Sequence, residues 1–481
     1  MRTSNILLIA PLFFFLLGQE FASSDVIASG KSVYEQRCAV CHGVDGKGDG
    51  PAQAFLYPKP RDLTAGRFKI RSTPTGSLPT DEDLFRTIAN GIPGTSMPSW
   101  RSIPEKERRA LVDYVKTFDE KFKTQVRKSI AVGSPPPRTP QLLAKGKQLY
   151  QDAGCNDCHG ATGQGDGPSA GTLKDDWENP ITPYDFTKGG RYKAGSSVRD
   201  IYRTFTTGMA GTPMPSYADS LDEDQRWALA YYVQSLSKRL TGPAPKEEAT
   251  VTSKFIKTDL SAPDPTSPVW KKAPGVDIYL RPLWFKEGYV DRVRVSSLHN
   301  GKEIAFLLEW EDLTKNADIE KLEPPRLVLA RALKRDHTKS ADIPRLEAFG
   351  DATALQFPVK ADGVPSFPMG EAGQVVNIWQ WRADWKGNGQ GSVQNLAAAG
   401  FGTLTTQLSQ DVKGKGIWSK GKWRVVFSRV MTGGGEVVGL APGKVMPVAF
   451  AVWNGAINQR DGEKSVSTWA FLKIEVPSKG E

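Results

Sequence analysis

The chain has 481 residues and a formal net charge of +10, from 63 Lys and Arg against 53 Asp and Glu. This length exceeds that of one small domain and suggests about three. The positive charge is equally consistent with binding to an acidic partner surface and with an ordinary, well-solvated basic face. We expect no nucleic-acid partner, because no basic run is interleaved with aromatic stacking residues.

The first 24 residues have the pattern of a secretory signal peptide. Arg2 precedes an apolar run from Ile6 to Leu17, and small residues at 22–24 offer a cleavage site. The run is shorter than the roughly 20 residues that span a bilayer, so we expect a cleaved signal rather than an anchor. The mature chain is then periplasmic or otherwise extracytoplasmic, with no membrane span after cleavage.

Two pentapeptides of the form C-x-x-C-H contain every cysteine of the chain. They comprise Cys38, Cys41 and His42 in the first, and Cys155, Cys158 and His159 in the second. In this pattern the thiols add to the vinyl groups of a c-type haem, and the histidine ligates the iron. We therefore expect two covalent haems, with no cysteine left for a disulfide, a zinc site or an iron–sulfur cluster.

The sequence around the first pentapeptide recurs around the second in the same register. Cys38 and Cys155 are 117 positions apart, and so are Met97 and Met214. A repeat that keeps register over this distance indicates two copies of one fold unit. Each copy resembles a class I cytochrome c, which predicts two small all-α domains over residues 25–125 and 140–240, joined by a proline-rich spacer.

Met97 and Met214 are the expected distal iron ligands, because each lies in a Gly-Thr-x-Met-Pro loop about 60 residues after its haem site. The alternative is that these methionines only pack in the apolar interior and do not bind iron. Met209 is a weaker competitor, since it aligns with Ile92. With both axial positions filled, neither iron offers a site to substrate, and this favours electron transfer over catalysis.

Arg67 and Arg191 occupy matching positions in the repeat. Either guanidinium could pair with a haem propionate, or both could be ordinary surface arginines.

Beyond a second break near residues 241–265, the apolar pattern changes to period two. After a turn at 299–302, the alternating residues are Ile304, Phe306, Leu308 and Trp310. Further runs typical of strands cover residues 352–359, 375–385, 423–430, 446–453 and 468–476. These runs predict an all-β sandwich over residues 255–481.

Several segments of this region resemble the haem b-binding subunit of the ethylbenzene dehydrogenase family. They are residues 351–358, 367–370, 376–382, 448–456 and 462–469. The resemblance implies one b haem between the sheets of the sandwich, with Met369 and Lys464 as its axial ligands. A lysine must be neutral to ligate, and an apolar pocket with a ferric iron favours that state.

The other candidates in this region are histidines and tryptophans. His299 and His337 are alternative ligands, but one lies in the predicted turn and the other in a charged stretch, where surface histidines are expected. Trp379 and Trp381, with Trp453, either wall the haem or are core aromatics on strands.

The resemblance further implies an electron-transfer subunit of a molybdenum oxidoreductase of the dimethyl sulfoxide reductase superfamily. Its partners would be a molybdopterin catalytic subunit, an iron–sulfur subunit, and a soluble cytochrome or terminal oxidase. Nitrite oxidoreductase is the preferred host complex. Two alternatives stay open: a free-standing periplasmic three-haem shuttle, and a haem enzyme with an open iron site.

Overall fold

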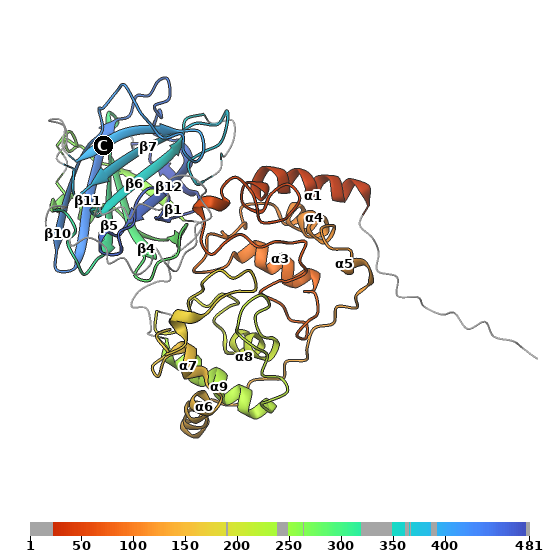
Figure 1. Ribbon diagram of the computed structural model, residues 1–481. Coiled ribbons are helices and arrows are strands. Elements are labelled where there is room, and N and C mark those ends of the chain that lie inside the picture. Colours follow the sequence, from red (N-terminus) through yellow and green to blue (C-terminus); the bar gives the residue numbers. More distant parts are fainter. Residues whose placement is uncertain are drawn as a thin grey trace, which may run out of the picture.

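The computed structural model describes residues 23–188, 191–237, 249–262, 264–318, 349–360, 365, 367–385 and 392–477. Within the described residues, the α-helices lie before residue 237 and the strands begin at residue 250 (Figure 1). The described strand-rich part also contains two short 3-10 helices, η3 (Pro268–Lys272) and η5 (Gly455–Ile457). The expected signal peptide and His337 lie outside the described residues, apart from positions 23 and 24. Within the described ranges, no helix has the length and apolar character needed to cross a membrane.

The helical part consists of two units that repeat the same order of elements. The first contains α1 (Ser24–Arg37), α2 (Ala39–His42), η1 (Gln53–Phe55), α3 (Asp81–Asn90), α4 (Glu105–Lys116) and α5 (Lys121–Thr124). The second contains α6 (Pro140–Asp152), α7 (Cys155–His159), η2 (Ala170–Thr172), α8 (Val198–Thr207) and α9 (Glu223–Leu236). A short helix thus covers the last four residues of the first pentapeptide, as α2, and all five residues of the second, as α7.

In both units the first helix crosses the last long helix, α4 or α9, at a glycine. A Cβ on Gly30 of α1 would lie 2.1 Å from the carbonyl oxygen of Ala110 in α4. A Cβ on Gly146 of α6 would lie equally close, 2.1 Å, to the carbonyl oxygen of Ala228 in α9. Only glycine permits this backbone approach, so the sequence repeat is also a repeat of the helix packing.

The helix caps differ between the units. The α9 helix has Asp222 as its N-cap, and the carboxylate accepts a hydrogen bond from the Gln225 amide. The α4 helix has Pro104 as its N-cap and no side-chain cap bond. The start of α4 therefore lacks the side-chain cap that α9 has.

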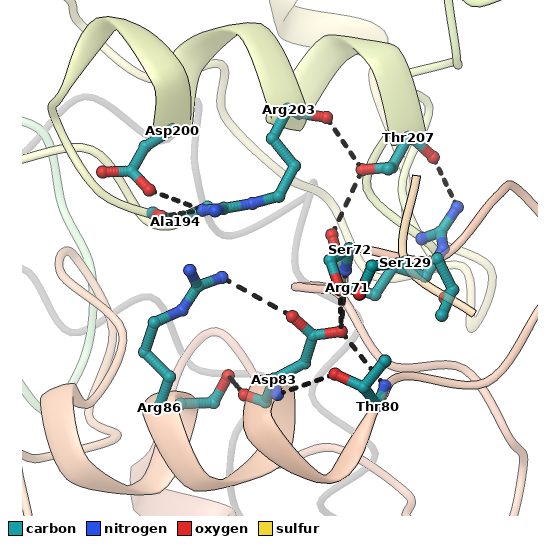
Figure 2. A network of polar contacts seen from close by, with 12 residues as sticks. Arg71, Ser72, Thr80, Asp83, Arg86, Ser129, Ala194, Asp200, Arg203 and Thr207 are labelled. Atoms are coloured by element: carbon teal, nitrogen blue, oxygen red, sulfur yellow. Dashed lines mark hydrogen bonds and ion pairs between the residues drawn. The ribbon is translucent and has the colours of Figure 1, made fainter. Parts of the chain in front are cut away.

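The two units face each other at α3 and α8, and touch at the end of α8. Arg71 of the first unit donates a hydrogen bond of 2.5 Å to the Thr207 carbonyl of the second. Figure 2 shows Asp83 and Arg86 on α3 facing Asp200 and Arg203 on α8 across this contact. Each arginine pairs with an aspartate of its own helix, so charge is balanced locally on both sides.

The strands form one hydrogen-bonded path that bends into two facing layers. Its order is β10-β11-β5-β4-β1-β14-β12-β6-β7-β8-β9. The first layer contains β1 (Thr250–Phe255), β2 (Val276–Tyr279), β4 (Arg292–His299), β5 (Glu303–Glu311), β10 (Lys413–Ser419), β11 (Lys422–Val430) and β14 (Ala470–Ile474). The second contains β3 (Arg281–Pro282), β6 (Ala352–Pro358), β7 (Val376–Arg382), β8 (Val393–Ala398), β9 (Thr405–Thr406) and β13 (Ser465–Val466). Strand β12 (Val445–Trp453) joins the layers, because it pairs with β14 on one side and β6 on the other.

Large aromatic side chains fill the space between the two layers. Phe306 of β5 contacts Trp379 of β7 with ring centroids 5.9 Å apart, and Trp381 contacts Trp423 of β11 at 5.0 Å. The four alternating residues predicted on one face, Ile304 to Trp310, all belong to this core. The five predicted strand runs correspond to β6, β7, β11, β12 and β14.

The prediction for His299 is wrong. This residue ends β4 rather than lying in the turn, and its side chain is completely buried beside Phe255. The turn begins one residue later, at Asn300, so strand pairing continues through the histidine.

Candidate haem sites

The histidine of the first pentapeptide is oriented by a backbone carbonyl. Nδ1 of His42 lies 2.9 Å from the carbonyl oxygen of Arg61. A tautomer that donates from Nδ1–H would leave Nε2 available to an iron. Burial lowers the pKa of His42, which keeps the imidazole neutral as ligation requires. The hydroxyl of Tyr34 donates to the carbonyl of Gly43, 2.8 Å away, and holds the turn after the histidine.

The second pentapeptide repeats this arrangement. Nδ1 of His159 lies 3.2 Å from the carbonyl oxygen of Tyr184, and the Tyr150 hydroxyl donates to Gly160 at 2.8 Å. The imidazole also stacks on Phe186, with ring centroids 4.4 Å apart. Burial lowers the pKa of His159 as well.

A cavity of about 250 Å³ opens beside the second pentapeptide. Its lining includes Cys155, Cys158 and His159, together with Met214. All four cysteines are free thiols, and no group of three or more metal-binding His, Cys, Asp or Glu residues occurs in the described part of the chain. The residues present therefore suit a covalent haem better than a zinc ion.

The two methionine loops are built by the same hydrogen bonds. The Met97 carbonyl accepts from the Ile92 amide at 3.1 Å, and the Met214 carbonyl accepts from the Met209 amide at 3.1 Å. In each loop a threonine hydroxyl two residues before the methionine also binds the methionine amide. Met209 thus occupies the place of Ile92, as the alignment predicts, although its side chain also lines the second cavity. The ligand roles of Met97 and Met214 stay predictions.

The two candidate propionate arginines have different surroundings. Arg67 forms an ion pair with Asp176 of the second unit, and its side chain is 57% exposed. Arg191 lines the second cavity, where its guanidinium lies 3.3 Å from the ring centroid of Tyr279. Two further cations of this cavity, Lys69 and Lys193, were not predicted, because nothing in the sequence distinguishes them from surface lysines.

Met369 and Lys464 lie in one pocket, although 95 positions separate them in the chain. Lys464 is only 7% exposed, and burial lowers its pKa to about 8. Its ammonium lies 5.0 Å from the ring centroid of Trp453, which also lines the pocket. Met369 has φ of +86°, a conformation that is strained for a side chain other than glycine and that often marks ligand-binding turns.

This pocket is on the outer face of the second layer, not between the layers as the resemblance implied. Along β6 and β7, Ala354 and Ile378 face the pocket, while their neighbours Leu355 and Trp379 point into the core. The reason is the alternation of side chains along a strand. The same alternation places Trp379 and Trp381 in the core, away from the pocket. The enclosed space is about 30 Å³, so a porphyrin would have to widen it.

The first haem unit packs against this pocket. Val40 and Cys41 belong to the same apolar cluster as Phe367, Ala451 and Val466. Phe367 and Val466 also line the Met369–Lys464 pocket. The first pentapeptide and the proposed haem b ligands are therefore neighbours.

Residues 279–291, which we call the junction segment, connect all three sites. The Leu283 amide donates to the carbonyl of Lys464 at 2.9 Å, and the Leu283 carbonyl accepts from the Tyr57 amide at 2.9 Å. Arg281 is almost fully buried and donates a 2.5 Å hydrogen bond to the carbonyl of Met97. Other junction residues, Tyr279, Phe285, Tyr289 and Asp291, line the second cavity.

The fold and these sites define an electron-transfer protein of the cytochrome c class, with two helical units and a large β-sheet region. A cytochrome c model matches residues 143–237, and a model described as cytochrome c oxidase, cbb3-type, subunit III matches residues 25–115. The ethylbenzene dehydrogenase model matches residues 267–407 and 397–465.

Two curated relatives identify the family. A protein of Haloferax mediterranei, described as the haem subunit of a respiratory nitrate reductase, is 30% identical over 51% of this chain and 83% of its own length. The dimethylsulfide dehydrogenase subunit gamma of Rhodovulum sulfidophilum is 31% identical over 44% and 82%, respectively. A solved reducing HAO-like protein complex of Kuenenia stuttgartiensis is 46% identical over 44% of this chain and 96% of its own, with a TM-score of 0.43. The chain belongs to the ethylbenzene dehydrogenase family of haem-binding gamma subunits.

Proposed function

We propose that this chain is a three-haem relay subunit of a molybdenum oxidoreductase. It carries two covalent c haems, at Cys38/Cys41 and Cys155/Cys158, and one b haem between Met369 and Lys464. It exchanges electrons with an iron–sulfur subunit beside a molybdopterin catalytic subunit, and with a soluble cytochrome or terminal oxidase. We place it outside the cytoplasmic membrane, after cleavage of the signal peptide.

One observation carries the proposal: Met369 and Lys464 share a buried pocket directly beside the first pentapeptide. A buried lysine with a pKa near 8 loses its proton readily, so it can donate a lone pair where a surface lysine cannot. Haem bound between a thioether and an amine would supply one-electron redox chemistry with both axial positions closed.

The protein's own residues would hold the three groups in a fixed arrangement. The junction segment binds the backbone of Lys464 through Leu283 and the backbone of Met97 through Arg281. The same segment walls the second cavity. Such a scaffold removes the diffusional step between separate carriers, since each site is positioned by contacts within one chain.

Nitrite oxidoreductase is our preferred host complex. The named relatives include a subunit of a reductase and a subunit of a dehydrogenase, so the family serves electron flow in either direction. The match of the first unit to a cbb3-type oxidase subunit favours an oxidase or its cytochrome donor at the distal end.

A pyridine haemochrome assay on the purified full chain tests the haem content. We expect two c haems for each b haem, and a preparation containing only c haem would refute the three-haem proposal. Replacing Lys464 with Ala should abolish or shift the b spectrum and leave both c haems intact. The matched control is Lys473→Ala, because Lys473 is exposed on β14.

The methionine ligand is tested by Met369→Leu, which removes the thioether and keeps side-chain volume. The b-haem spectrum should change, whereas Met446→Leu on β12 should leave it as in the parent. Co-purification then tests the host complex. A lone monomer under gentle conditions would favour the free-standing shuttle instead.

A further inference from the structure

The cavity beside the second pentapeptide is not built by the second unit alone. The first unit contributes Tyr57, Lys69 and Gly94 to its wall, and the junction segment contributes Tyr279 and Phe285, among others. A group that fills this cavity would contact all three parts of the chain.

Lysines from both helical units reach this cavity. Lys69 comes from the first unit and Lys193 from the second, and the charge of Lys193 acts on Lys69 strongly enough to lower its pKa. Burial is the larger cause, and the pKa of Lys69 falls to about 7 and that of Lys193 to about 8.

The other charges of the cavity are already compensated. Lys188 pairs with Glu287 and lies 4.0 Å from Asp185. Burial raises the pKa of Asp291, and the positive charges of Arg292 and Arg191 oppose this rise. By contrast, no ion pair within 4.0 Å involves Lys69 or Lys193 among the residues that the structure describes. The negative charge of Asp175 raises the pKa of Lys69, but by less than burial and the positive charges of Lys193 and Arg61 lower it.

Two like charges in one largely enclosed space are unfavourable without a counter-ion. The counter-ion must be anionic, must reach two ammonium groups from different units, and must fit a cavity that also holds Cys155, His159 and Met214. The propionate edge of a haem attached at the second pentapeptide meets all three requirements.

The geometry points to Lys69 and Lys193 as a clamp, shared between the two helical units, that binds the propionates of the second c haem. This inference rests on the proposed attachment of that haem, but not on the b haem. Lys69 would thus be a positioning residue that the first unit supplies to the haem of the second. Haem attachment in the second unit would then also fasten the two units together.

A solvent anion is the competing occupant. Lys193 also lines an open cleft of about 510 Å³ between the units, together with Arg86, Arg101 and Asp200. Inorganic phosphate could enter that cleft and neutralise the same lysines, so the experiment must separate the two sources.

The test is a spectroelectrochemical titration of the full haem-loaded chain carrying Lys69→Met or Lys193→Met. A cation near a haem stabilises its reduced form, so each variant should lower the potential of the same c haem. One charge about 12 Å away at an effective dielectric of about 20 changes the reduced-to-oxidised ratio roughly tenfold, which is about 59 mV for one electron. That haem should be the one whose potential also moves in Met214→His.

Three comparisons complete the design. Lys47→Met removes an exposed lysine, 60% accessible and 4.0 Å from Asp45, and should change neither c haem. Lys69→Arg keeps the charge and should retain the parent potential. This control shows whether a change in Lys69→Met comes from the lost charge or from a defect in folding. Resonance Raman bands of the propionates should shift in both Met variants.

The inference is overturned if both Met variants retain the potential of the second c haem, or if Lys69→Met moves only the first. It is also overturned if added inorganic phosphate shifts the parent potential as far as the variants do. If both c haems are present and their potentials are unchanged in the Met variants, the clamp is refuted but the three-haem proposal is not. Absence of the b haem would refute the three-haem proposal and leave the clamp standing.

Discussion

Replacing Gly146 with Ala tests whether the two ends of the second unit are in direct backbone contact. The added Cβ would lie 2.1 Å from the Ala228 carbonyl oxygen, 2.7 Å from its carbon and 2.8 Å from Cβ of Tyr232. Cβ contacts shorter than 3.0 Å essentially never occur, so α6 and α9 must separate by about 1 Å.

The expected cost follows from two opposing effects. Overpacking against a rigid backbone costs roughly 3 kcal/mol, at the upper end of its usual range. The higher helix propensity of alanine offsets about 1 kcal/mol of this cost. We therefore expect the second unit to be destabilised by about 2 kcal/mol, which is close to a thirtyfold change in its opening equilibrium.

Native-state hydrogen exchange measures this change for one unit of a multidomain chain, where a single global unfolding energy is not defined. Amides of α6 and α9 should exchange about thirtyfold faster in the variant. The exchange rates of amides in α1 and α4 should stay the same. Gly171→Ala is the matched control, since a Cβ there meets nothing within 4 Å. Unchanged exchange in α6 and α9 would refute the close crossing.

Three further predictions concern single polar groups. Tyr150→Phe removes the hydroxyl that binds the Gly160 carbonyl, and should destabilise the second unit by about 1–3 kcal/mol in the same exchange experiment, because a buried acceptor loses its donor. Burial raises the pKa of Asp351 to about 7, above its unfolded value of 3.8. The strand-rich part should therefore be most stable at acidic pH and lose stability as pH rises through about 7, and Asp351→Asn should flatten this dependence in thermal melts. Arg281→Met removes a buried cation that binds the Met97 carbonyl, and should lower the midpoint potential of the first c haem while leaving the second unchanged.

The c-haem candidates could be predicted from sequence because their signals are local. Each pentapeptide carries its own ligands, and the 117-residue register of the methionines is preserved in matching loop hydrogen bonds. Strand periodicity likewise identified the core residues from Ile304 to Trp310. In both cases the relevant neighbours lie on the same element or in the same repeated unit.

The remaining features depend on how separate elements dock. Trp379 and Ile378 are adjacent and both apolar, so periodicity cannot say which of them faces the core. His299 precedes a strong Asn-Gly turn signal, but pairing with Phe255 and Ile304 extends the strand through it. Lys69 resembles any surface lysine until the second unit covers it.

Part of the positive net charge of the chain lies inside the protein and not on its surface. At the sequence level, +10 favours an acidic partner surface. Yet Arg281 is buried at the first methionine loop, and Lys69 and Lys193 line an internal cavity. Bound haems would place negative propionates beside these groups. Part of the positive net charge would then neutralise anions inside the protein. The haem-loaded surface should then be less basic than the sequence suggests, and association with an acidic carrier should depend on salt less steeply than +10 implies.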